Sequence, residues 1–216
     1  MENSYTGTKV RMHFLILLVM SLLLLFLNKS FLLSDSLYFN SLSEKFSYEE
    51  ISELINRRNR LELLTIPIVL LVCIIKLTLC SLCLTLGIFF IADKFEFKKI
   101  FAVTVAAEFI FLVPSAIKLL WFLFFQTTYT FQDLQYFYPL SILNIFEANT
   151  LEPWLIYPLQ VLNIFEVIYW IVLAYLLTKE LPELDMNRSM TVVMASYGTG
   201  LVIWVAFVMF LTLTYT

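Results

Sequence analysis

Residues 64–92 read LTIPIVLLVCIIKLTLCSLCLTLGIFFIA, and Lys76 is the single charged residue among them. A helix needs about 20 apolar residues to cross the roughly 30 Å hydrocarbon core of a bilayer. This stretch exceeds that length and lacks the polar face that a helix on a soluble protein would carry. The segment therefore predicts a transmembrane helix.

Four further apolar stretches of similar length flank this one, and they cover residues 14–33, 100–125, 154–177 and 190–213. The composition agrees, since 61% of the chain is hydrophobic and 14% is charged; soluble domains have roughly 45–50% and about 25%. We therefore predict an all-α polytopic transmembrane bundle of five spans, with residues 1–216 forming a single domain in the lipid bilayer.

The chain carries no recognisable catalytic or cofactor pattern. It lacks GxSxG, HExxH and a phosphate-cradling loop, and it holds only four glycines. Cys73, Cys80 and Cys83 lie in one apolar run, and the chain has one histidine, so the thiols are expected to pack rather than to bind a metal. A net charge of -3 without a basic tract argues against nucleic acid as a partner. We predict a non-enzymatic protein without cofactor or metal.

Two segments between the spans are expected at the membrane surface. Ser47 and Glu50 match a capping box, and apolar residues at helical spacing follow, so residues 47–61 predict an amphipathic helix that turns into the next span near Pro67. A solvated charged helix is the alternative. Residues 129–150 hold few charges and many aromatic residues, which predicts an interfacial or re-entrant segment.

A ten-residue sequence occurs twice in the second half of the chain. YPLSILNIFE at 138–147 and YPLQVLNIFE at 157–166 are identical at eight of ten positions. Each copy has a proline near its start, where the first turn of a helix tolerates the missing N–H. We predict that each copy begins a helix, the first in the loop and the second at the start of span 154–177.

Besides Lys29, which interrupts the first span near its end, four charged side chains lie within the predicted spans, where a charge costs roughly 2.5 kcal/mol or more. They are Lys76, Glu108, Lys118 and Glu166. At about 1.5 Å per residue, Lys76 and Glu166 reach similar depths and are predicted to pair. Lys118 lies near enough to the outer surface to snorkel. These charges either fix the register of the helices or form a relay or substrate path.

Other polar and small residues accompany these charges. Asn163 lies three residues before Glu166 and is expected to share its helix face, while Glu108 falls level with Ser196 and Tyr197. Span 190–213 also carries a helix-packing face of small residues, which are Ala195, Gly198, Thr199 and Gly200. Small residues let a neighbouring helix approach closely.

Basic residues in the loops favour a cytoplasmic N-terminus and an outer C-terminus, and the predicted outer loop 126–152 has no Lys or Arg. The first span, which follows Lys9 and Arg11, has a signal peptide as its alternative. No small-residue cleavage pattern follows it, so we expect an uncleaved span.

Three stretches carry a family resemblance: FIFLVP at 109–114, YPLSILNIF at 138–146 and LNIFEVIYW at 162–170. With them, the chain from about Ser47 onwards resembles the Yip family of five-span membrane proteins. Eukaryotic members act in vesicle traffic and bind small GTPases. The predicted cytoplasmic tail of about a dozen residues departs from that pattern, so GTPase binding is doubtful and a bacterial inner-membrane protein is expected.

The small predicted area outside the bilayer favours an accessory or scaffolding subunit that binds other integral membrane proteins, in a transport or secretion complex. The alternative is a small permease or a transporter half-unit that uses the intramembrane charges. Five spans fit poorly with two inverted repeats.

Overall fold

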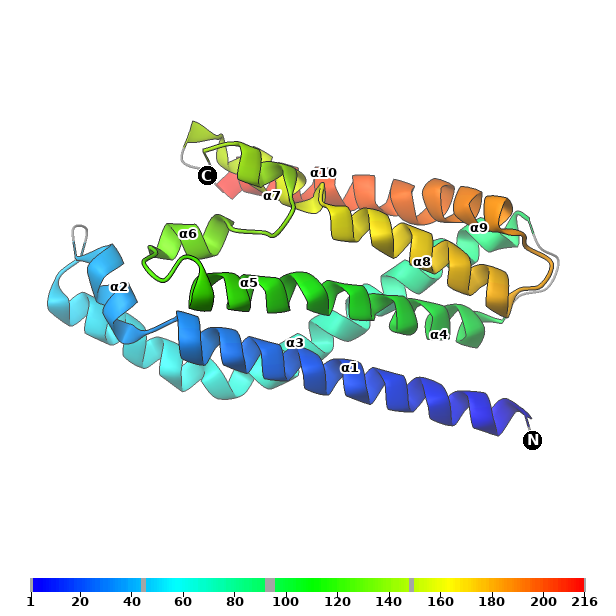
Figure 1. The fold of residues 1–216 in the computed structure, drawn as a ribbon, viewed down its shortest axis with the longest axis horizontal. Coiled ribbons are helices and arrows are strands. Elements are labelled where there is room, and N and C mark those ends of the chain that lie inside the picture. Colours follow the sequence, from blue (N-terminus) through cyan, green and yellow to red (C-terminus); the bar gives the residue numbers. More distant parts are fainter. Residues whose placement is uncertain (1, 44–45, 92–95, 148–149, 216) are drawn as a thin grey trace.

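The computed structural model describes residues 2–43, 46–91, 96–147 and 150–215, and it is a bundle of helices that follow one long axis (Figure 1). No strand forms within these ranges. The predicted all-α fold is confirmed.

Four helices are long and apolar enough to cross a membrane, as judged over the described residues; they cover Lys9–Leu32, Leu64–Phe89, Phe97–Phe124 and Met186–Tyr215. They agree with four of the five predicted spans to within a few residues. Ala92, the predicted end of the second span, lies outside the described residues.

The predicted span 154–177 is not among these four, because the structure divides it. Helix α7 (Pro153–Val161) and helix α8 (Ile164–Glu180) are separated by Leu162 and Asn163, which leave the helical conformation. The side chain of Asn163 caps the first turn of α8, and a capping residue takes a non-helical backbone. Neither piece alone reaches the length of the other four.

Helix α1 (Glu2–Leu32) precedes a short helix, α2 (Asp35–Leu42), and α3 (Tyr48–Phe89) follows. The capping box of Ser47 and Glu50 that starts α3 is confirmed.

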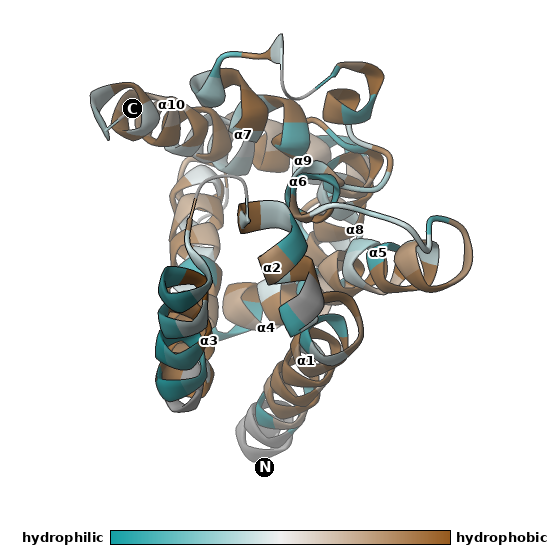
Figure 2. Cartoon of the chain, turned by 90° about the vertical axis from the view of Figure 1, so that its left-hand side faces the viewer, coloured by the Kyte–Doolittle hydropathy of each residue, from teal (hydrophilic) through white to brown (hydrophobic). Residues whose placement is uncertain are grey.

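The predicted amphipathic helix and the second span form one helix, because α3 continues through Pro67 without a break, and α3 changes direction along its length (Figure 1). A proline removes one backbone hydrogen bond from a helix, so its neighbours must hold the helix together. The first half of α3 has such support: Arg58 binds Asp35 of α2 at 2.8 Å and lies 4.8 Å from the centre of the Tyr38 ring. Hydrophilic residues gather on this first part of α3 (Figure 2).

The third span is interrupted in its middle. Helix α4 (Phe97–Ala107) passes through a 3-10 turn, η1 (Glu108–Phe111), into helix α5 (Leu112–Phe124). Pro114 lies three residues after the end of η1, in the first turn of α5, and it disfavours α-helical geometry in the turn before it. The change from α-helical to 3-10 geometry in η1 therefore lies in the turn that Pro114 disturbs.

The segment after α5 folds against one end of the bundle. It contains helix α6 (Phe131–Tyr136) and a 3-10 turn, η2 (Ile142–Ile145). The Tyr129 hydroxyl donates to the Leu32 carbonyl of α1 at 3.2 Å, and the Phe137 ring packs on Phe122 with centroids 5.2 Å apart. Two positions of the predicted 129–150 segment, 148 and 149, lie outside the described residues.

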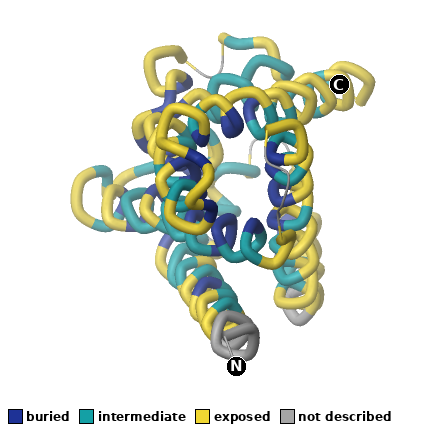
Figure 3. Tube along the Cα trace, turned by 90° about the vertical axis from the view of Figure 1, so that its right-hand side faces the viewer, coloured by how far each residue is buried: buried dark blue, intermediate teal, exposed yellow. Residues whose placement is uncertain are grey.

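The last span begins with α9 (Met186–Val192), widens into a π-helical turn, η4 (Val193–Gly198), and continues as α10 (Thr199–Tyr215). The largest buried cluster draws side chains from α3, α4, α8 and the α9–η4 segment. Buried residues face inward and exposed residues cover the outside (Figure 3). Helix α1 begins and α10 ends at opposite ends of the long axis (Figure 1).

Candidate intramembrane polar site

Lys76 of α3 forms an ion pair with Glu108 of η1. The predicted pairing of Lys76 with Glu166 is therefore wrong. That prediction counted depth along an unbroken span from residue 154, whereas Glu166 lies in the first turn of the shorter helix α8.

The packing of α3 against α4 explains the pair that does form. The hydroxyls of Ser81 and Thr104 are 2.7 Å apart and join the two antiparallel helices one turn away. Lys76 lies thirteen residues before the end of α3 at Phe89, and Glu108 lies eleven residues after the start of α4. The short connection between these helices was a signal in the sequence, since folding the chain about it brings both positions to one level.

The two members of the pair differ in exposure. The Lys76 side chain is 47% exposed and its ammonium lies 4.0 Å from the centre of the Phe111 ring, whereas the Glu108 side chain is 12% exposed. Lys76 binds the Oε1 atom of Glu108. The Oε2 atom is buried and has no hydrogen-bond partner among the described residues. One acceptor of the pair is thus left open.

Glu166 forms a second polar group with the last span. Its Oε1 accepts hydrogen bonds from the Tyr197 hydroxyl at 2.7 Å and from Trp170 Nε1 at 3.0 Å. Asn163 lies close by, as predicted, but as the cap of α8 rather than as a residue on its face: its Oδ1 accepts from the Glu166 N–H at 2.9 Å. Ser196 bonds the Val192 carbonyl of its own helix at 2.6 Å.

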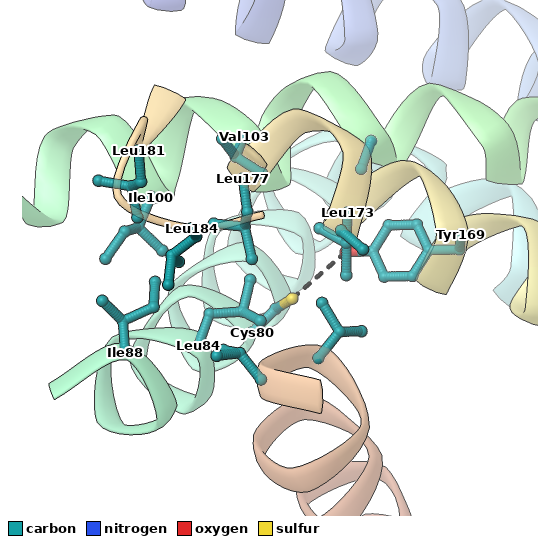
Figure 4. Close-up of a cluster of buried hydrophobic side chains, with 14 residues drawn as sticks. Cys80, Leu84, Ile88, Ile100, Val103, Tyr169, Leu173, Leu177, Leu181 and Leu184 are labelled. Carbon is teal, nitrogen blue, oxygen red and sulfur yellow. Dashed lines mark hydrogen bonds between the residues drawn. The ribbon is translucent and has the colours of Figure 1, made fainter. Parts of the chain in front are cut away.

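Tyr169 connects the two polar groups. Its ring centre lies 4.8 Å from that of Phe111, beside the ion pair, and 5.3 Å from that of Tyr197. Its hydroxyl lies 3.3 Å from Cys80 Sγ, the contact drawn within the buried cluster in Figure 4. Ring contacts, rather than hydrogen bonds, join the two groups, so the described side chains do not form an unbroken proton path here.

The first copy of the repeat closes over the start of α8. The Ile142 N–H donates to the Leu162 carbonyl at 3.0 Å, and the Ile164 N–H donates to the Leu140 carbonyl at 3.3 Å. Nearby, burial raises the pKa of Tyr138 to about 12, and the charges of Glu166 and Glu108 act in the same direction. The two hydrogen bonds donated by the Ile142 and Ile164 N–H groups satisfy backbone groups that the break at Leu162 leaves outside a helix. Unpaired buried backbone groups would be costly.

Lys118 stands apart from this site. It lies in α5 and donates to the Leu134 carbonyl in α6. The lysine therefore ties the segment after α5 to the bundle, and its interaction is with a helix C-terminal carbonyl, which carries partial negative charge.

The predicted packing face divides between two environments. A Cβ atom at Gly200 would lie 2.8 Å from Cys83 Sγ, and one at Gly198 would lie 3.0 Å from the Trp170 ring. These glycines let the last span approach its neighbours within the chain. Ala195 and Thr199 are exposed on the other side.

No family model, no curated protein and no solved structure matches the chain.

Proposed function

We propose that this chain is a non-enzymatic accessory or scaffolding subunit that binds another integral membrane protein through the face of α3 around Lys76. The observation that carries this proposal is the position of the Lys76 side chain. It lies midway along the apolar stretch Leu64–Phe89 and is nearly half exposed on the outside of the bundle.

The cost of such a charge in lipid supports a partner at this face. A lysine at the centre of a membrane helix costs roughly 2.5–3.5 kcal/mol or more, and its pairing with Glu108 recovers only part of the lost hydration. The apolar neighbours Ile75 and Leu79 are each 48% exposed. The exposed surface beside the Lys76 ammonium group is therefore apolar and offers it no hydrogen-bond acceptor. A helix of a second protein would shield the pair from hydrocarbon.

We further propose a topology of five crossings, in which α7 and α8 together form the fourth. Helix α8 supplies buried side chains to the centre of the bundle. The start of α1 and the end of α10 lie at opposite ends of the long axis, which agrees with an odd number of crossings (Figure 1). The segment with α6 and η2 would lie at the interface. The N-terminus would be cytoplasmic and the C-terminus outside.

The location proposed is a bacterial inner membrane, on the strength of the resemblance to the Yip family. The partner expected is a transporter or a secretion machine, and a small GTPase is not expected. The absence of a basic tract again argues against nucleic acid.

Partner capture tests the proposal. The tagged chain is purified at native expression in a mild detergent, and a partner in stoichiometric amount is expected. Leu79→Trp places a large ring one turn from Lys76 while leaving the ion pair intact, so it should release that partner. Ile203→Trp, on the outside of α10, is the matched control and should retain it. A chain that purifies alone contradicts the proposal.

A small permease or transporter half-unit is the second candidate, and the open Oε2 atom of Glu108 favours it. Purified protein in vesicles with a pH gradient would then give a proton-coupled signal. Glu108→Gln should abolish the signal, whereas Glu147→Gln in the loop should preserve it. Unaltered flux in Glu108→Gln removes this candidate.

A further inference from the structure

The first part of α3 carries three arginines with different surroundings: Arg57, Arg58 and Arg60. Arg58 binds Asp35 of α2 at 2.8 Å. Arg57 and Arg60 are exposed, and no ion pair or side-chain hydrogen bond links either of them to another described residue. Positions three residues apart are neighbours on a helix. One face of α3 thus carries two adjacent positive charges that no described carboxylate contacts.

Exposed apolar side chains continue this face of α3 toward the membrane. Leu61, Leu64 and Ile68 follow Arg57 at intervals of four, three and four residues, which is the spacing of one helix face. Each of the three is more than half exposed. The face therefore begins with two arginines and continues as an apolar stripe.

The membrane boundary would cross α3 where the basic side chains give way to this apolar stripe. The apolar stretch of α3 begins at Leu64, and Arg60 and Arg57 lie about 6 Å and about 10 Å before it along the helix axis. The polar headgroup region outside the hydrocarbon core is roughly 5–8 Å thick. Figure 1 agrees, since α2 and the start of α3 extend beyond the end of α5 along the long axis. Long arginine side chains can therefore reach the lipid phosphates.

The acidic residues near these arginines do not neutralise the face. Glu53 lies one turn before Arg57, farther from the apolar stretch, and no ion pair joins these two described residues. Glu62 follows Arg60 by two residues, so its position lies about 200° around the helix. The two arginines are thus the charges of this face that lie nearest the membrane surface, an order that favours a negatively charged partner in the headgroup layer.

We propose that Arg57 and Arg60 bind the headgroup phosphate of an anionic phospholipid, whose acyl chains lie along Leu61, Leu64 and Ile68. Guanidinium groups donate paired hydrogen bonds to phosphate oxygens. A zwitterionic lipid is a poorer occupant, because its ammonium group brings a further positive charge to the site. An acidic protein surface fits less well, since the same stripe runs on into a surface that would face hydrocarbon. This site does not depend on the proposed partner protein.

Native mass spectrometry of the purified protein in detergent micelles tests this site. The protein is titrated with phosphatidylglycerol or with phosphatidylcholine of the same acyl chains, and bound lipids are counted from the mass. The first phosphatidylglycerol should bind about tenfold or more tightly than phosphatidylcholine. Arg57→Gln with Arg60→Gln should weaken phosphatidylglycerol binding about thirtyfold, because each arginine near an anionic lipid surface contributes about fivefold.

A charge-matched control removes two exposed basic residues at the other end of the bundle. Lys98→Gln with Arg188→Gln lowers the positive charge by the same amount, near the starts of α4 and α9 (Figure 1). This control should retain tight binding of phosphatidylglycerol. All four substitutions lie at exposed positions, so both double variants should fold, and circular dichroism checks that they do.

Four results overturn the proposal. Equal affinity for the two lipids is the first, and an equal loss of binding in the charge-matched control is the second. The third is displacement of the lipid by an equal concentration of glycerophosphoglycerol, the headgroup without acyl chains, which would assign the site to a soluble phosphate ester. The fourth is loss of a stoichiometric protein partner from the arginine variant with unchanged lipid binding. Release of a partner by Leu79→Trp concerns the proposed function alone.

Discussion

The two copies of the ten-residue repeat, 138–147 and 157–166, share eight identical positions and fold differently. The first copy makes a turn and enters the 3-10 turn η2. The second ends α7, leaves the helical conformation at Leu162 and Asn163, and starts α8. The prediction that each copy begins a helix at its proline is wrong for both copies: Pro139 lies in a turn three residues before η2 begins, and Pro158 lies inside α7.

The same residue types also exchange their environments between the copies. Leu143 is 1% exposed and its counterpart Leu162 is 55% exposed, whereas Phe146 is 49% exposed and its counterpart Phe165 is 5% exposed. Each copy buries a different side chain of the same motif. Burial therefore follows from what each copy packs against, since the local sequence is nearly the same.

The largest expected effect separates the two phenylalanines. Phe165→Ala removes a buried ring from α8 and should lower the free energy of unfolding by about 3–5 kcal/mol. Phe146→Ala, at the same position of the first copy, should cost less than about 1 kcal/mol because that ring is half exposed. Unfolding by SDS titration in mixed micelles, followed by circular dichroism, measures both. Equal losses would contradict a difference set by packing.

A smaller effect distinguishes the two asparagines. Asn163 caps α8 and donates to the Gln160 and Val161 carbonyls at 2.9 Å, so Asn163→Ala should cost about 1–2 kcal/mol. Asn144 is exposed and donates to the Tyr138 carbonyl, so Asn144→Ala should cost about 0.5–1 kcal/mol.

Hydrogen exchange gives a local readout for this pair. The Glu166 amide, whose acceptor is Asn163 Oδ1, should exchange faster in Asn163→Ala and remain unchanged in Asn144→Ala. Unchanged protection of that amide in both variants would show that the cap does not hold the start of α8.

The smallest effect is expected when the copies are made identical. Gln160→Ser with Val161→Ile gives the second copy the sequence of the first, and it should change the free energy of unfolding by no more than about 0.5 kcal/mol. Asn163 bonds the backbone carbonyls of these two positions, which the substitutions retain. Faster hydrogen exchange throughout α7 would instead assign the difference between the copies to these two side chains.

In the candidate site, too, some features could be predicted from the sequence and others could not. Lys76, Glu108 and Glu166 could be singled out from the sequence because a charge in an apolar run is conspicuous. Their partners could not be assigned from depth alone, since depth depends on where each helix begins. The short connection between α3 and α4 would have favoured Glu108 for Lys76, but the contact of Glu166 with Tyr197 required the position of the last span.

By itself, the sequence determined the all-helical class, four long apolar helices and the capping box at Ser47. These features depend on neighbours along the chain, because apolar length and capping are local properties. Tertiary structure alone decided the break at Asn163, the partner of each buried charge and the different shapes of the two repeat copies. Such features arise only when helices distant in sequence meet, since each buried polar group must then find its partner on the surface that it faces.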